Sequence, residues 1–454
     1  MGRIARILGL EPGEGGAVAR MALVYGAIGA STTVADTLVQ SAFLARAGAE
    51  ALPYVLGARA VLSPALAWTY SRTARRRSSR GVLSVIALLN AVAIAGARVA
   101  LDLGPVGATA AYAVHEIASA LLTLHWGVYL LDHFRPDAAK RAVAPIYAGA
   151  RGAAVIGGVF VALGAPAFGG VNALYVAAAL YVVTAALAFL PSRLHRWRAG
   201  TRGQDARRVE AARAPQGDAD FSNRASDDDA EALLVDAEET IHAERAARKR
   251  GWSLLRQSPL LGTIAVATIA MVFVRITLRY GQQSILDAID EAALAALLGW
   301  YAAAANAISI ALQLMVTGRL LQRIGVGATN ALYAGATLVT QGALWFFGAS
   351  LPSALAARFT ESELKHALKT PVSPLFYQGF FGADRFRARS FVLGLISPAA
   401  NLAGALALGL LVRAPDLVAP IGFGVALGYV LVSLAQGRAY RQATQDVPLK
   451  NSSD

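Results

Sequence analysis

Residues 81–99 read GVLSVIALLNAVAIAGARV, a run of 19 residues in which Arg98 is the single charged side chain. About 20 apolar residues in a helix span the ~30 Å hydrocarbon core of a bilayer, so this run predicts one transmembrane helix. The rest of the chain repeats the pattern, with six spans before a long polar stretch and six after it. The twelve predicted spans cover residues 17–44, 52–70, 81–99, 106–131, 142–163, 171–189, 259–282, 292–316, 327–347, 351–380, 391–412 and 418–434.

The composition also predicts a membrane protein. Of the 454 residues, 56% are hydrophobic and 16% are charged, whereas soluble domains carry about 25% charged residues. We therefore expect an all-α membrane protein with two six-helix bundles, residues 1–190 and 258–436, joined by a central loop at 191–257 and followed by a cytoplasmic tail at 437–454. The chain has no cysteine, which excludes thiol catalysis and metal sites built on cysteine.

Lysine and arginine are concentrated in the loops after the even-numbered spans. The opposite loops hold little beyond Arg46, Arg413 and an acidic stretch at 287–291. Because cytoplasmic loops carry the excess of Lys and Arg, both termini and the central loop are predicted to be cytoplasmic. The basic residues that decide this are Arg72, Arg75, Arg76, Arg77, Arg80, Arg135, Lys140, Arg141, Arg319, Arg323, Arg385, Arg387 and Arg389. The same rule accounts for most of the net charge of +13, so we expect a lipid bilayer and no nucleic acid as partner.

The central loop contains one helical pattern. Leu233, Leu234, Ala237 and Ile241 form an apolar stripe at helical spacing, with acids before it and bases after it, as the helix dipole favours. This pattern predicts an amphipathic cytoplasmic helix that joins the bundles. A regulatory docking site is the alternative.

The two halves of the chain resemble each other in their loops. The second span runs into Arg72 and Arg75, and the eighth into Arg319 and Arg323. Equivalent hairpins on the same membrane side imply parallel repeats, and in this the chain resembles major-facilitator transporters. The turn at 318–325 is also similar to the short loop motif of that superfamily.

Ionisable side chains inside predicted spans indicate a functional centre, because they are costly at bilayer depth unless they line a cavity or pair with each other. In the functional interpretation the cations surround a cavity that attracts an anion, since the planar guanidinium group suits phosphate. The acids could couple transport to an ion gradient. The candidates are Arg59, Arg151, Arg275, Arg279, Arg358 and Lys365 for the anion, and Asp36, Glu116 and Glu361 for coupling or gating.

The alternative is structural: Glu116–Arg151 and Glu361–Lys365 would be ion pairs that hold helices together, and arginines near span ends would reach the interface. The excess of cations over acids favours an anionic solute over a cationic one. Aromatic side chains that could stack on a base are Tyr147, Tyr280, Trp300 and Tyr377.

The enzyme motifs that the sequence suggests are incomplete. His115-Glu116 begins like the zinc-peptidase HExxH motif, but Ser119 stands at the second ligand position. The glycine-rich stretch at 149–158 lacks the lysine of a nucleotide-hydrolysing loop. No nucleophile has a base at usable spacing. We therefore expect no enzyme activity, no metal site and no cofactor.

Several stretches resemble one family, the bacterial and plastid-type ATP/ADP carriers, also called nucleotide transporters. They are Glu11-Pro12-Gly13-Glu14, Asp36-Thr37-Leu38-Val39, Gly48-Ala49-Glu50-Ala51-Leu52-Pro53-Tyr54, Glu116 with Trp126, Ala138-Ala139-Lys140-Arg141, Leu368-Lys369-x-Pro371, Leu375-x-Tyr377-Gln378 and Arg387-Ala388-Arg389. The likeness extends over most of the membrane part. It implies twelve spans and nucleotide exchange, and we expect the cytoplasmic (inner) membrane of a bacterium as the location.

The chain departs from this family at three positions. Ala35 stands where the carriers have a lysine, Arg275 where they have an acid, and Ser373 where they have a second lysine, whereas Glu116 keeps the expected type. These changes predict that a different phosphate pattern is bound, as in a paralogue with another anionic substrate.

The sequence thus predicts an alternating-access transporter for an anionic, phosphorylated metabolite, with nucleotides as the first candidate. Two alternatives stay open. One is a proton-coupled exporter of amphipathic compounds, which would have an apolar cavity. The other is a membrane sensor or scaffold without transport, which would contact a partner through the central loop.

Overall fold

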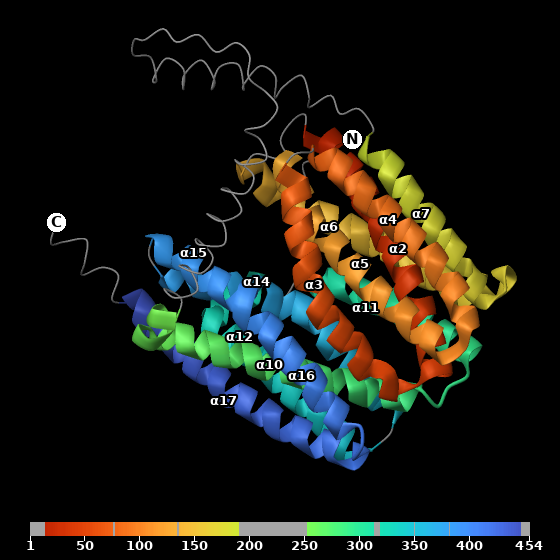
Figure 1. Ribbon diagram of the computed structural model, residues 1–454. Coiled ribbons are helices and arrows are strands. Elements are labelled where there is room, and N and C mark those ends of the chain that lie inside the picture. Colours follow the sequence, from red (N-terminus) through yellow and green to blue (C-terminus); the bar gives the residue numbers. More distant parts are fainter. Residues whose placement is uncertain are drawn as a thin grey trace, which may run out of the picture.

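The computed structural model describes residues 14–75, 78–133, 136–189, 252–312, 318–348, 350–380 and 382–445 (Figure 1). Within these ranges the regular structure is entirely helical, with no strand. The amphipathic helix predicted at Leu233, Leu234, Ala237 and Ile241 lies outside the described residues.

The N-terminal set of helices surrounds α2, which is long and mostly apolar. It consists of α2 (Glu14–Ala47), α3 (Leu52–Arg75), α4 (Ser79–Ala100), α5 (Gly104–His133), α6 (Pro136–Val159) and α7 (Leu174–Ala188). Helix α2 packs against α5, α6 and α7, while α4 packs between α5 and α7. One apolar core therefore joins these six helices.

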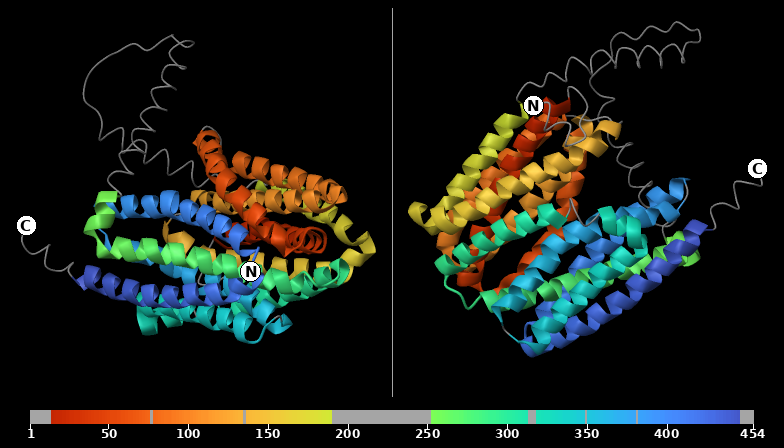
Figure 2. Two further views of the ribbon diagram at one scale, coloured as in Figure 1. Left: turned by 60° about the horizontal axis from the view of Figure 1, so that its bottom comes forward. Right: turned by 180° about the vertical axis from the view of Figure 1, so that it is seen from behind.

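The C-terminal set repeats this arrangement around α10. It consists of α10 (Pro259–Leu286), α11 (Glu291–Ala311), α12 (Gly318–Phe346), α13 (Leu351–Phe359), η7 (Thr360–Lys369), α14 (Thr370–Val372), η8 (Ser373–Gly379), α15 (Gly382–Phe391), η9 (Val392–Ile396), α16 (Ser397–Leu411) and α17 (Val418–Gln445). Helix α10 packs against α13, α16 and α17, and α12 packs against α17. In both views of Figure 2 the two sets lie side by side, and they share part of one apolar core.

All twelve predicted spans overlap helices, and the all-α, two-bundle architecture is confirmed. Eight segments of the described residues have the length and apolar composition to cross a membrane, and one of them, Ser79–Leu130, contains both α4 and most of α5. Helix α3, helix α12 and the α13–η8 segment are absent from those eight. Charged or polar side chains occupy these helices, including Arg59, buried Asn330 and Glu363.

The tenth span is the one that differs most from the prediction of a continuous helix over 351–380. After α13 the chain widens into a ten-residue π-helix, η7, and then narrows into the 3₁₀ turns of η8. At the end of η7 the backbone N–H of Thr370 donates to the carbonyl of Lys365. Pro371 and Pro374 follow at once and supply no backbone N–H, so the α-helical hydrogen-bond ladder cannot continue. Wide turns of this kind are frequent at functional sites.

The two sets meet where glycines allow backbones to touch. Helix α11 packs against α6 and α2, and α16 packs against α3. A Cβ atom on Gly158 would lie 2.6 Å from the carbonyl oxygen of Gly299 and 2.7 Å from the backbone nitrogen of Ala303. Only glycine fits this crossing between α6 and α11.

Candidate functional site

Charged side chains from both helix sets converge between them. Helices α2, α3, α5 and α6 contribute from one side, and α10, α13 and η7 from the other. We call these ten residues the central charge network: Asp36, Arg59, Glu116, Arg151, Arg275, Arg279, Arg358, Glu361, Glu363 and Lys365.

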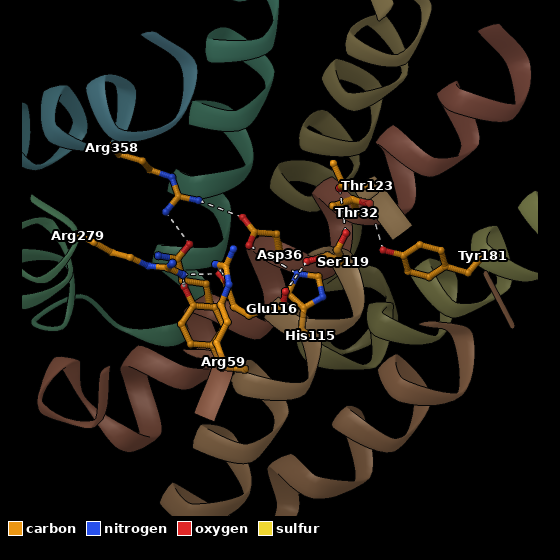
Figure 3. Close-up of polar contacts among 12 residues, drawn as sticks. Thr32, Asp36, Arg59, His115, Glu116, Ser119, Thr123, Tyr181, Arg279 and Arg358 are labelled. Atoms are coloured by element: carbon orange, nitrogen blue, oxygen red, sulfur yellow. Dashed lines mark hydrogen bonds and ion pairs between the residues drawn. The ribbon is translucent and has the colours of Figure 1, made fainter. Parts of the chain in front are cut away.

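Glu116 on α5 is the centre of the largest cluster (Figure 3). Its Oε2 accepts a hydrogen bond from Nη1 of Arg59 at 2.5 Å, and its Oε1 accepts one from Nη2 of Arg279, which belongs to the other helix set. Arg279 also donates to the hydroxyl of Tyr112 at 2.5 Å, and the amide of Gln283 donates to the same hydroxyl at 3.2 Å. Glu116 thus joins both helix sets through two arginines.

Asp36 on α2 is the second contact between the sets. Arg358 of α13 reaches it with Nη2 at 3.4 Å and donates from Nη1 to Oε1 of Gln40 at 2.6 Å. The Nε2 atom of buried His115 lies 3.6 Å from Oδ1 of Asp36. Asp36 is therefore placed between an arginine and an imidazole (Figure 3).

The π-helix η7 supplies two further carboxylates. Glu361 accepts from Nη2 of Arg275 at 2.5 Å. Glu363 accepts from Nη1 of Arg151 at 2.7 Å and from the hydroxyl of Ser309 at 2.5 Å. Arg151, which lies on α6, connects the sets a third time.

Lys365 differs from the other cations of the network. Within the described part of the chain, its ammonium group has no hydrogen-bond or ion-pair partner, although it is only partly exposed. The charges that act on it are Arg275, Glu361, Arg59 and Arg279. The network therefore contains one cation without a carboxylate.

The ion pairs expected from the sequence form with other partners. Glu116 pairs with Arg59 and Arg279 rather than with Arg151, and Glu361 pairs with Arg275 rather than with Lys365. The predictions of Glu116–Arg151 and Glu361–Lys365 pairs are therefore wrong. Each pairing depends on which helices face each other in the folded protein, and spacing along one helix does not encode this.

Two of the aromatic residues that were predicted to stack on a base lie away from the central charge network. Tyr280 lines a pocket with Trp345 and Asp416, and Tyr377 is buried among side chains such as Phe376 and Phe380. Among the described residues neither has a polar contact with the network. Of the other two aromatic candidates, Tyr147 packs edge-on against Tyr25, and Trp300 is exposed on α11.

Several polar residues of the site were not selected from the sequence: Gln40, Tyr112, Gln283, Asn306, Ser309 and Glu363. Gln40 and Tyr112 could have been found, because each lies four residues from a network carboxylate, Asp36 or Glu116, and so shares its helix face. Asn306, which accepts from Arg151 at 2.7 Å, and Ser309 lie on α11, whose sequence contains no charged residue near them. No spacing rule singles these two out.

Two side chains of the network are partly exposed. The exposed fractions are 37% for Asp36 and 39% for Arg59, although both side chains are ion-paired. No group of three or more His, Asp or Glu side chains suited to a metal occurs in the described ranges. The network contains more cations than carboxylates, and its cations carry hydrogen-bond donors.

A further set of contacts closes one end of the molecule, where the α2–α3 and α10–α11 turns meet. Arg46 donates from Nε and Nη2 to both carboxylate oxygens of Glu291 at 3.0 and 3.1 Å, and from Nη1 to the carbonyl of Leu101 at 2.7 Å. The backbone N–H of Ala49 donates to Oδ2 of Asp287 at 3.2 Å. Among the described residues, the polar contacts between the sets occur at this end and in the network.

A double-mutant cycle on Arg46→Ala and Glu291→Ala tests this closure. We expect a coupling free energy of about 1 kcal/mol, at the upper end for a partly exposed pair because the contact is bidentate. The measurement is chemical unfolding of the wild type, both single variants and the double variant in detergent. The pair Arg98–Asp102, within one helix set, is the control, with about 0.3–0.5 kcal/mol expected. A coupling between Arg46 and Glu291 no larger than the control would contradict the closure.

No protein-family model matches the sequence, and no curated protein matches it. Solved structures do match over nearly the whole chain. A bacterial homolog of the human lysosomal transporter Spinster, in an inward-facing and unoccupied conformation, shares 13% identity at a TM-score of 0.55 and covers 94% of this chain and 96% of its own. A bacterial homologue of the iron transporter ferroportin, in an inward-facing state, shares 12% identity at a TM-score of 0.60, covering 92% and 98%.

The nucleoside transporter NupG shares 13% identity at a TM-score of 0.57, covering 94% of this chain and 98% of its own. These structures are membrane transporters with diverse substrates. At such low identity the likeness concerns the fold, and the chain has the major-facilitator-like fold.

Proposed function

We propose that the protein is an alternating-access transporter for a small anionic solute, a phosphorylated metabolite, with nucleotides as the first candidate. The observation that carries the proposal is the composition of the central charge network. It contains six cations and four carboxylates, so it holds an excess of two positive charges at a depth where charge is costly. An anionic solute compensates this excess.

The carboxylates act as partners for the arginines while the site is empty. Each of Asp36, Glu116, Glu361 and Glu363 accepts from at least one arginine, which avoids leaving a guanidinium group buried and unpaired. A phosphate group is tetrahedral, but two of its oxygens can bind one guanidinium group in the same bidentate way as the two oxygens of a carboxylate. A bound phosphate can therefore take over donors without a large change in their positions.

The closed end of the molecule supports alternating access. In the orientation that the positive-inside rule predicts, the α2–α3 and α10–α11 turns face outward, and the Arg46–Glu291 contact closes the outer side. Both termini then lie in the cytoplasm of a bacterial cell. The proposed cycle breaks the Arg46–Glu291 contact when the helix sets rock about the network.

The charged centre argues against the exporter of amphipathic compounds, which requires an apolar cavity. Glu116 is also paired with two arginines. The contacts of a non-transporting sensor would involve the central loop, outside the described residues.

Ligand-induced stabilisation tests the proposal. We expect at least one phosphate compound from a panel of nucleotides, sugar phosphates and inorganic phosphate to raise the melting temperature of the protein in detergent. Non-phosphorylated dicarboxylates serve as controls. A ligand at 100 times its dissociation constant stabilises by about 2.7 kcal/mol, which such an assay resolves. The compound with the largest effect should then exchange across proteoliposomes. Binding without flux would favour the sensor, and no stabilisation by any phosphate compound would refute the proposal.

A further inference from the structure

The two excess positive charges of the network are not spread evenly. Arg151 pairs with Glu363, and Arg358 pairs with Asp36, so each of these contacts is neutral as a unit. The remaining six residues contain the whole excess. We call them the cationic cluster: Arg59, Arg275, Arg279 and Lys365 with Glu116 and Glu361.

The cationic cluster retains hydrogen-bond donors for a ligand. Both oxygens of Glu116 are occupied by arginines, whereas the ammonium group of Lys365 has no partner among the described residues. The Nε atom of Arg275 is buried and also has no hydrogen-bond partner there. A buried donor without an acceptor costs free energy, and an anion between Lys365 and Arg275 would remove that cost.

The cluster is also shared between the helix sets. Arg59 belongs to α3 of the N-terminal set, and Lys365 belongs to η7 of the C-terminal set. Arg59 is the most exposed arginine of the cluster, so an entering solute can reach it. A group that binds both side chains would connect the two halves of the transporter.

This inference rests on the proposed function and narrows its substrate. We infer that the solute carries a phosphate monoester, a dianionic group, which Lys365 and Arg59 hold together with Arg275. A phosphate monoester carries a charge of about −1.5 to −2 at pH 7, which matches the excess of two positive charges. A diphosphate or triphosphate carries more negative charge than the cluster's excess of positive charge. A sulfate monoester carries a single negative charge and would leave the cluster with a net positive charge.

Binding of matched ligands tests the charge match. We measure dissociation constants in detergent for AMP, ADP and ATP without divalent metal, and for glucose 6-phosphate against glucose 6-sulfate. The expected result is tighter binding of AMP than of ADP or ATP. Glucose 6-phosphate should likewise bind more tightly than its sulfate analogue.

Variants of Lys365 identify the responsible group. Lys365→Gln should weaken binding of the phosphate monoesters by about tenfold or more and change that of the sulfate ester by about twofold at most. Because Lys365 has no partner to lose, this variant should fold. Lys365→Arg keeps the charge and should retain the preference. Lys369→Gln is the matched control: Lys369 lies four residues on in the same π-helix but donates to Asn330, and its loss should leave the preference unchanged.

Two results would overturn the inference without touching the proposed function. One is tighter binding of ATP or ADP than of AMP, and the other is an equal effect of Lys365→Gln on the phosphate and sulfate esters. If no phosphate compound binds the wild type at all, the proposed function itself fails. The wild-type panel thus separates the two failures.

Discussion

Replacing Glu116 by alanine is expected to destabilise the protein by about 3–5 kcal/mol, the range for removing one partner of a buried ion pair. Glu116 and Arg279 are only 13% and 12% exposed, so the variant leaves the guanidinium of Arg279 buried and unpaired. Arg59 is 39% exposed, so water screens its charge when the contact with Glu116 is removed. The main effect therefore comes from Arg279. The measurement is the free energy of unfolding from denaturant titration in detergent.

Two further variants make this prediction specific. Glu116→Gln keeps an oxygen acceptor for one arginine and should fall between wild type and alanine. Asp384→Ala removes the partner of Arg387 in a half-exposed pair within one helix and should cost less than about 1 kcal/mol. If Glu116→Ala costs no more than Asp384→Ala, Glu116 does not hold the two helix sets together.

Replacing Gly158 by alanine is expected to cost about 2–3 kcal/mol or more. The added methyl group would lie 2.6 Å from the carbonyl oxygen of Gly299 and 2.7 Å from the nitrogen of Ala303. Both atoms belong to the backbone of α11, so no side-chain rotation relieves the overlap, and overpacking costs of this size are typical. The helices must separate, which should also slow transport in proteoliposomes.

Gly152 on the same helix provides the control. A Cβ atom there would meet nothing within 4 Å, and alanine stabilises a helix interior by about 0.5–1 kcal/mol relative to glycine. Gly152→Ala should therefore be neutral or stabilising in the same unfolding experiment. Equal effects of the two substitutions would mean that α6 and α11 do not approach this closely.

Much of the fold could be predicted from the sequence because hydrocarbon imposes a strong and local requirement. Every backbone polar group in the membrane must be satisfied within its own helix, so an apolar run such as residues 81–99 encodes its structure by itself. The π-helical turn in the tenth span was not predicted. Pro371 signals an interruption, but whether the chain kinks, widens or narrows there depends on what packs around it.

The candidate site, like the fold, could be predicted from the sequence only in part. Every charged residue of the network except Glu363 was selected from the sequence, because a charge within an apolar run is conspicuous and costly. The pairing of Glu116 with Arg279, of Glu361 with Arg275 and of Arg151 with Glu363 was decided only by the tertiary structure. The reason is physical: membrane depth is set by position along one helix, whereas these ion pairs depend on how two separate helices are rotated against each other, and only their packing determines that rotation.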